Sequence, residues 1–404
     1  MRSVRPLLTA TCAAAALALT ATGCGGGDST GDDKSAGAAA SSASAAADPA
    51  SGGDGSGDGD APAIPADLAD ALKKHGVDPE KWKDGGWKDW DRKKWLSEAK
   101  DFVNPVIDGL WKPERMQKAT SPTKTLATQD ISGDRDVTDP EPSPVRAVAE
   151  KTPYHKNAAP VGKVFFDAPE GSMVCSATVV KDPANPGRSN LVWTAGHCVH
   201  AGGTGGWYRN IAFVPAYNDL GKSAAALDRA SSQEIAPYGV YWADWVSTSG
   251  EWIEGGGPTG GAGAAYDYAV MHVEPEKGGK SLEETVGTAL DVDFDLPEAA
   301  NIAGMGAWGY PAAAPYDGLL MHKCVDKPGR LSVSPGTPTM WRIGCTMTGG
   351  SSGGGWFATQ PGGKLVLVSN TSIGPVTSGW LAGPRLGAGA EQIYTAMSDR
   401  FGGR

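Results

Sequence analysis

From Val161 onward, the chain alternates short apolar runs with clusters of glycine, proline and aspartate. Apolar runs of roughly four to eight residues, bounded by turn-forming residues, are typical of β-strands. The pattern therefore predicts an all-β barrel or sandwich over this part of the chain. The predicted strands are Val161–Phe166, Cys175–Val180, Leu191–Thr194, Ile211–Pro215, Tyr268–Val273 and Leu365–Ser369.

The last stretch of the chain has a helical period instead. Ile393, Tyr394 and Met397 are spaced as on one face of a helix. We therefore expect one C-terminal helix over Ala390–Phe401.

The first residues of the chain have the pattern of an export signal. Arg2 and Arg5 precede an apolar run that continues to Gly23, which predicts a signal peptide over residues 1–23. The run ends at Cys24 in a sequence that resembles the lipobox of bacterial lipoproteins, so we expect Cys24 to be lipidated; the alternative is ordinary signal cleavage nearby with Cys24 unused. Either route predicts an extracellular location, secreted or as a cell-surface lipoprotein.

Three segments separate this leader from the predicted strands. Residues 24–62 are rich in glycine, alanine, serine and aspartate, which predicts a disordered tether. Residues 63–112 contain helix signals and five tryptophans, and we interpret them as a small helical pro-region or accessory segment. Its tryptophans either pack as core or form a surface for glycan, wall polymer or lipid headgroups. Residues 113–154 lack any period and are expected to be a linker.

The net charge and the cysteine content limit the classes of function that this protein can have. The formal net charge of -10 argues against nucleic acid as a partner. Four cysteines lie beyond the leader and Cys24, and in an exported protein they are expected to form two disulfides. Pairing sequence neighbours joins Cys175 to Cys198 and Cys324 to Cys345. The competing interpretation, a metal site built from Cys198, His197 and His200, does not have the spacing of known zinc sites.

A candidate general base follows the third predicted strand. In Trp193-Thr194-Ala195-Gly196-His197-Cys198, a tight Ala-Gly turn places His197 beside a predicted disulfide. A general base needs such a fixed position and a pKa near neutrality, which histidine supplies. A lone histidine is a surface or core residue as often as it is a general base.

A candidate nucleophile lies in the run Thr348–Gly355. A serine hydroxyl needs a base to take its proton, and the attacked carbonyl needs N–H donors for the developing oxyanion. The glycines on both sides of Ser351 and Ser352 permit the tight backbone that aims such N–H groups. A glycine-serine run is also typical of a flexible loop, but this one lies between a cysteine and a predicted strand.

A candidate orienting acid precedes another predicted strand. Asp267 begins the apolar run that follows Ala265-Tyr266, and an acid there can fix the tautomer of a catalytic histidine. An aspartate at such a place is more often a turn residue, and Asp244 and Asp219 are rivals for the role.

Together these motifs resemble the trypsin-like (chymotrypsin-fold) serine proteases, in particular the bacterial secreted branch near the glutamyl endopeptidases. The order histidine, aspartate, serine is that of this family. The resemblance covers roughly residues 155–404. It is carried by Trp193–Cys198 with Cys175, Tyr266–Val270, Gly309–Pro311 and Gly350–Gly354.

The resemblance implies a fold and a set of roles. The fold is all-β: two six-stranded antiparallel β-barrels with a C-terminal helix, here preceded by the small helical N-terminal segment. His197 is expected to be the base, Asp267 its orienter and Ser352 the nucleophile. The N–H groups of Gly350 and Ser352 are expected to form the oxyanion hole.

Departures from the family bear on specificity and activation. Ser351 stands where the animal enzymes have an aspartate, so maturation by burial of a new N-terminus against that acid is not expected. The position six before the nucleophile is the neutral Thr346, which argues against cleavage after lysine or arginine. Val368-Ser369 stand where glutamyl endopeptidases carry a histidine, which argues against acidic specificity. With Thr346 and Ser369 in the substrate pocket, we expect a preference for apolar or small side chains.

The sequence therefore predicts an exported serine endopeptidase that acts on protein or peptide substrates through an acyl-enzyme. The alternatives are an inactive surface binding module with this fold and an esterase that uses the same residues. No metal and no organic cofactor is implied. A monomer is expected, attached to a membrane only if Cys24 is lipidated.

Overall fold

The computed structural model describes residues 104–403, except 105, 123–124, 128–130, 132, 204, 259, 296–297 and 378. The predicted signal peptide, the tether, the lipidation of Cys24 and most of the tryptophan-rich segment lie outside these residues. Within the described part of the chain, every helix is too short or too polar to cross a lipid bilayer.

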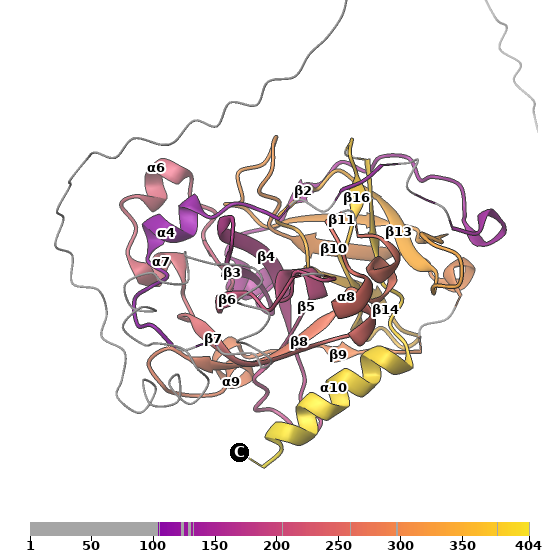
Figure 1. The fold of residues 1–404 in the computed structure, drawn as a ribbon. Helices are drawn as coiled ribbons and strands as arrows, with labels where there is room; N and C mark the ends of the chain where they lie inside the picture. The colour runs from indigo at the N-terminus through magenta and orange to yellow at the C-terminus, as the bar shows by residue number, and fades with distance from the viewer. Residues whose placement is uncertain are drawn as a thin grey trace, which may run out of the picture. The chain divides into compact units, whose positions relative to one another are not determined.

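The first half of the described chain forms a closed barrel of six strands in the order β3-β4-β5-β8-β7-β6 (Figure 1). All neighbouring strands in it are antiparallel. Its strands are apolar along nearly their whole length because successive residues enter two different cores: Val164 faces one and Phe165 the other. The strands are β3 Val161–Ala168, β4 Gly171–Val180, β5 Leu191–Thr194, β6 Arg209–Pro215, β7 Tyr241–Thr248 and β8 Ala269–Pro275.

The second half packs two sheets around a core that includes Trp341 and Trp356. A six-stranded sheet has the order β2-β11-β10-β14-β15-β9, and a three-stranded sheet has the order β12-β13-β17. The six-stranded sheet contains β2 Val148–Ala149, β9 Asp291–Val292, β10 Met305–Gly309, β11 His322–Asp326, β14 Gly355–Thr359 and β15 Leu365–Asn370. The other contains β12 Gly329–Leu331, β13 Met340–Cys345 and β17 Gly379–Gly383. The expected all-β fold is confirmed, with one closed six-stranded barrel. In place of a second closed antiparallel barrel, the described second half contains these two sheets, and β15 pairs with β9 in parallel.

One disulfide braces each half. Cys175 on β4 is bonded to Cys198, and Cys324 on β11 is bonded to Cys345 on β13. These are the two expected pairs. Since the Cys198 sulfur is part of a disulfide, it is not a thiolate that can hold a metal.

The predicted C-terminal helix is α10, Ala388–Phe401. It buries Tyr394, Met397 and Phe401, and the Tyr394 hydroxyl donates a hydrogen bond to the Lys181 carbonyl at 2.5 Å. The remaining described helices are short. They are α4 Pro113–Lys118, η3 Arg135–Val137, α5 Tyr154–Asn157, η4 Gly196–Cys198, α6 Ala224–Leu227, α7 Ser232–Ile235, α8 Gly250–Gly255, η5 Ala262–Tyr266, α9 Leu282–Val286 and η6 Ala299–Asn301.

The segment expected to be a linker packs against both halves of this unit. Met116 and Leu126 are almost fully buried. Two short strands belong to it: β1, Thr125–Leu126, pairs in parallel with β16, Gly374–Pro375, and β2 pairs with β11. Trp111, the one tryptophan of the predicted helical segment that is described, is 4% exposed and packs 5.4 Å from the Phe165 ring. For Trp111, core packing is therefore the correct interpretation.

Candidate active site

His197 is held in a buried turn at the end of β5. The strand passes through Ala195 into the single turn η4, and Cys198 is tied back to β4. Gly196 is required here, because a Cβ at this position would lie 2.7 Å from the Thr248 hydroxyl and 2.9 Å from the Trp252 ring. The turn thus fixes both the backbone and the ring of His197, which is 0% exposed.

Asp267 contacts His197 twice. Its Oδ1 accepts the His197 backbone N–H at 2.7 Å, and its Oδ2 lies 2.6 Å from Nδ1 of the ring. The carboxylate is an acceptor, so Nδ1 carries the proton and Nε2 carries the lone pair. Nε2 is buried and has no hydrogen-bond partner among the described residues. The ring is therefore poised to accept a proton at Nε2.

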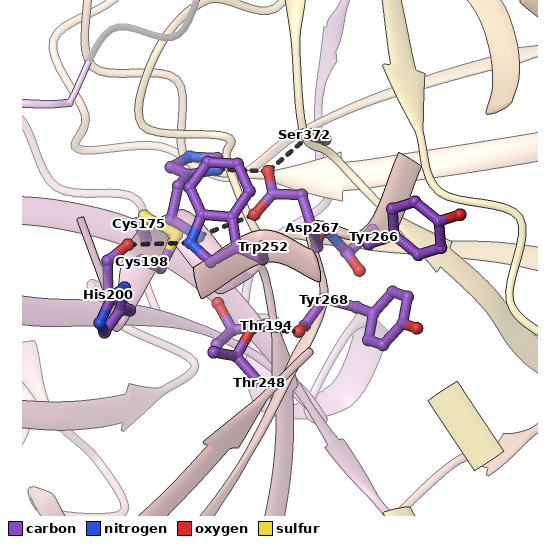
Figure 2. Close-up of polar contacts among 12 residues, drawn as sticks. Cys175, Thr194, Cys198, His200, Thr248, Trp252, Tyr266, Asp267, Tyr268 and Ser372 are labelled. Atoms are coloured by element: carbon purple, nitrogen blue, oxygen red, sulfur yellow. Dashed lines mark hydrogen bonds and ion pairs between the residues drawn. A yellow bond between two sulfur atoms is a disulfide. The ribbon is translucent and has the colours of Figure 1, made fainter. Parts of the chain in front are cut away.

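Asn370, the last residue of β15, and Ser372, just beyond it, hold Asp267 in turn. The Ser372 hydroxyl donates to Asp267 Oδ2 at 2.5 Å, and the Asn370 amide donates to the Asp267 carbonyl at 2.9 Å. Figure 2 shows the Ser372 bond to the carboxylate. The indole N–H of Trp193 donates to Asn370 at 3.0 Å, so β5 and β15 are joined beneath the site. The sequence analysis did not find Ser372 and Asn370; a polar triplet directly after an apolar strand was the available signal.

The two alternative candidates for the orienting acid contact other histidines. Asp244 lies 2.6 Å from Nδ1 of His272, and Asp219 lies 2.7 Å from Nδ1 of His155. Asp267 is thus the one of the three that the structure pairs with His197.

Ser352 lies in the tight loop between β13 and β14. Gly350 adopts a φ of +97°, and a Cβ there would lie 2.6 Å from the Tyr310 carbonyl, so only glycine fits. The Ser351 hydroxyl donates to the Thr348 carbonyl at 2.7 Å, which occupies its proton within the loop. Among the described residues, no hydrogen bond is made by the Ser352 hydroxyl or by the N–H groups of Gly350 and Ser352. These are the groups that a nucleophile and an oxyanion site require to be free.

The loop that holds Ser352 packs against the turn that holds His197. The Gly353 position is packed so closely on the turn before His197 that a Cβ would lie 2.2 Å from the Thr194 hydroxyl and 2.9 Å from the Ala195 nitrogen. Ser372, which bonds Asp267, lines the same cavity as Ser352. The structure thereby brings together the histidine, the acid and the serine that the sequence analysis selected.

The cavity beside Ser352 has a volume of about 210 Å³. Its walls mix apolar side chains with neutral hydroxyls, and among the described residues no charged side chain lines it. The lining residues are Thr125, Ala313, Ala314, Met347, Thr348, Gly349, Ser351, Ser352, Thr371, Ser372, Ile373, Gly374, Pro375, Val376, Trp380 and Leu381.

The two expected pocket residues, Thr346 and Ser369, are not among the described residues that line this cavity. Thr346 accepts the Ala147 N–H at 2.9 Å and contacts the Tyr316 hydroxyl, and Ser369 donates to the Pro384 carbonyl at 2.7 Å. Met347 and Thr348 line the cavity from the loop after Cys345, and Thr371 lines it on the strand side.

The chain matches no protein-family model and no curated protein. Among solved structures it is similar to AL20, a thermostable serine protease from an extremophilic microorganism, with 33% identity over 60% of this chain and 98% of AL20 (TM-score 0.48). It is also similar to the protease Anisep from Arthrobacter nicotinovorans, with 27% identity over 62% of this chain and 99% of Anisep (TM-score 0.48). A Glu endopeptidase shares only 13% identity over 65% of this chain and 99% of its own (TM-score 0.43), too little to transfer specificity.

The 33% identity to AL20 extends over 98% of that serine protease. The chain belongs to the trypsin-like, chymotrypsin-fold serine proteases.

Proposed function

We propose that this protein is an exported serine endopeptidase in which Ser352 attacks the peptide bond and His197 and Asp267 activate it. The observation that carries the proposal is the buried His197 ring, protonated at Nδ1 by its contact with Asp267 and unpartnered among described residues at Nε2. Such an arrangement converts a serine hydroxyl into a nucleophile.

The proposed reaction begins when the Ser352 oxygen attacks the scissile carbonyl carbon and its proton passes to Nε2 of His197. The N–H groups of Gly350 and Ser352 bind the oxyanion that forms. Collapse of this intermediate breaks the C–N bond, and His197 gives the proton to the leaving amine. A water molecule then attacks the ester on Ser352 by the same route, which releases the acid and restores the hydroxyl.

Asp267 and Ser372 stabilise the positive charge that forms on the His197 imidazole when it takes the proton. Asp267 is 1% exposed, so its carboxylate acts on His197 with little screening by water. The Ser372 hydroxyl and the Asn370 amide compensate for burial of this acid.

The cavity supports a preference for apolar or small side chains next to the cleaved bond. Met347, Ile373 and Trp380 supply apolar walls, and Thr348 and Thr371 are neutral. Neither a basic nor an acidic side chain of a substrate would meet an opposite charge among the described residues that line this cavity. Efficient cleavage only after lysine, arginine or glutamate would contradict this preference.

The assignment of the domains also remains a proposal. We propose that residues 1–23 direct export and that Cys24 and the tether carry a lipid anchor, supported by the leader sequence and by two disulfides. Residues 63–154 are proposed as a pro-region or accessory segment, and the catalytic domain as a monomer that begins near residue 155.

The proposal is tested by expressing residues 25–404 and the Ser352→Ala variant by an export route and incubating both with a mixed peptide library. Mass spectrometry is expected to find cleavages by the parent chain alone. Equal cleavage by both chains would refute the role of Ser352. Absence of cleavage by either, also from a chain that starts near residue 155, would favour the inactive binding module. Comparing peptide amides with esters separates the endopeptidase from an esterase.

A further inference from the structure

We propose that Ser176 is a positioning residue that holds the main chain on both sides of Ser351 and thereby shapes the oxyanion site; this inference rests on the proposed function. Ser176 lies in β4 of the first barrel and is 0% exposed. Its backbone N–H donates to the Ser352 carbonyl at 2.7 Å. Its hydroxyl donates to the Gly350 carbonyl at 2.9 Å. One residue of the first barrel therefore fixes two carbonyls of the nucleophile loop.

The hydroxyl of Ser176 is itself held in place. It accepts the Tyr310 N–H at 2.9 Å, so its proton is directed toward Gly350. The Ser176 carbonyl accepts the Thr194 hydroxyl at 2.9 Å, which links the residue to the turn before His197. Ser176 thus connects both halves of the unit at the point where the proposed base and nucleophile meet.

Each other peptide plane of the loop already has an anchor. The Gly349 carbonyl accepts the Ala312 N–H at 2.6 Å, and the Ser351 carbonyl accepts the Gly354 N–H at 3.0 Å. The plane that joins Gly350 to Ser351 has two anchors: the Ser176 hydroxyl holds its carbonyl, and the Thr348 carbonyl accepts its N–H at 3.2 Å. Because Gly350 is a glycine at φ +97°, this plane can tilt at low cost once the Ser176 hydroxyl is removed. The two neighbouring planes carry the N–H groups of Gly350 and Ser352, so a tilt of the plane between them changes the angle between these two donors.

The test compares Ser176→Ala with Ser189→Ala. Ser189 is a matched control: it is 0% exposed, its hydroxyl donates to the Val180 carbonyl at 2.5 Å, and it accepts the Leu191 N–H at 3.0 Å. For both variants we would measure Tm, kcat and KM on a peptide substrate, and the affinity of a peptide aldehyde that forms an adduct resembling the transition state.

Ser176→Ala is expected to lower kcat by about tenfold, to leave KM within about twofold, and to weaken the aldehyde by the same factor as kcat. Ser189→Ala is expected to lower Tm alone. If Ser176→Ala lowers Tm like the control while kcat and aldehyde affinity stay unchanged, the role is structural and the inference is wrong. Should Ser176→Ala not fold, Ser176→Cys offers a weaker donor of similar shape and is expected to give an intermediate kcat. A parent chain that neither cleaves peptides nor binds the aldehyde would instead overturn the proposed function.

The described residues between 104 and 150, which we call the strap, carry a second and independent inference. Its first part is fixed to the first barrel: the Trp111 indole donates to the Asn210 carbonyl at 2.8 Å, and Arg115 contacts both oxygens of Asp167 at 2.8 Å. Its later part is fixed to the second half, where Arg330 contacts Asp139 at 2.8 Å. The strap is therefore attached to both halves.

Between these two attachments, the strap lies at one edge of the cavity that Ser352 also lines. Thr125 lines this cavity, and β1 pairs with β16, whose Gly374 and Pro375 also line it. Leu126 is 1% exposed and packs in a cluster with Ile373 and Trp380. An extended peptide needs such a strand edge for its main-chain hydrogen bonds. The strap already uses it.

We infer that the strap competes with peptide substrates and lowers activity until β1 is displaced, which also rests on the proposed function. Leu126→Asp places a charge in the buried cluster and is expected to release β1. Val148→Asp, in the same strap but 61% exposed, is the control. Leu126→Asp is expected to lower KM for a peptide substrate at least about tenfold, with kcat within about twofold.

A synthetic peptide of residues 120–133 is then expected to inhibit Leu126→Asp competitively. Unchanged KM in a folded Leu126→Asp variant, or no inhibition by the peptide, would overturn the inference. If the variant does not fold, limited proteolysis of the parent within residues 127–133 replaces it, and unchanged KM after that cut has the same meaning. Complete absence of cleavage and of aldehyde binding in every form would point to failure of the proposed function instead.

Discussion

The Ser372 hydroxyl donates to Oδ2 of Asp267 at 2.5 Å, and the same oxygen lies 2.6 Å from Nδ1 of His197. A residue of the second half thus stabilises the acid that orients a histidine of the first barrel. The contact joins residues 105 positions apart, and it exists only when both halves are assembled. Removal of this single hydroxyl should therefore lower activity.

Ser372→Ala should lower kcat about tenfold, because a hydrogen bond to a buried carboxylate contributes roughly 1.5–3 kcal/mol. Ser369→Ala is the control, since that buried hydroxyl donates to the Pro384 carbonyl and does not touch Asp267. Steady-state kinetics on one peptide substrate measures both. Equal kcat in the two variants would contradict the role of Ser372.

Asp267→Asn should lower kcat by about 10³- to 10⁴-fold. The amide has one acceptor oxygen for two N–H donors of His197, so the ring is expected to turn to the tautomer with its proton on Nε2. That tautomer cannot accept the Ser352 proton. Asp244→Asn removes the acid from the His272 pair and should retain parental kcat. A comparable loss in both variants would show that general destabilisation is the cause.

Replacing Cys324 and Cys345 together by serine should lower the free energy of unfolding by about 3 kcal/mol, the loop-entropy value for a sequence separation of 21. This disulfide braces β11 and β13, so kcat should change little. Denaturant titration of the oxidised parent and the double variant gives the difference. Equal unfolding midpoints would refute the prediction.

Stability should also depend on Lys163. Burial lowers the pKa of its ammonium from 10.5 to about 7, with Asp317 opposing the shift. Below pH 7 both folded and unfolded chains carry the charge, so the folded chain bears the full cost of burying it. Between pH 7 and 10.5 only the unfolded lysine still binds its proton, so stability rises with pH through this window.

Lys163→Met should therefore stabilise the protein at pH 6 by on the order of 2 kcal/mol, after the lost hydrogen bond to Gly318 is subtracted. The gain should shrink as the pH approaches 10. Lys181→Met, at a side chain that is 48% exposed, is the control. Denaturant unfolding at pH 6, 8 and 10 tests this, and a gain that does not vary with pH would contradict it.

The sequence predicted the parts of the site that depend on local signals. The apolar run before His197, the glycines around Ser352 and the acid before β8 each lie within a few residues of the element that positions them. The strands of the barrel and helix α10 were predictable for the same reason, because period and turn residues are local properties.

The supporting residues could not be predicted in this way. The Ser176 hydroxyl meets Gly350 across 174 positions, and no local pattern distinguishes it from any other strand serine. Residue counting from Ser352 selected Thr346 and Ser369, whereas the cavity beside Ser352 is lined by Met347, Thr348 and Thr371, because the path of the loop decides which side chains face it. The strap has no period in its sequence; strand edges of the second half, β16 and β11, give Thr125 and Val148 their pairing.

The central claim, that His197 activates Ser352 as the nucleophile, is tested most directly by labelling. The chain would be treated with a fluorophosphonate, which phosphonylates an activated serine, and the modified residue would be identified by mass spectrometry of its peptides. The account predicts one label, on Ser352, that is absent in His197→Ala. A label on Ser351, or none on the folded parent chain, would contradict it.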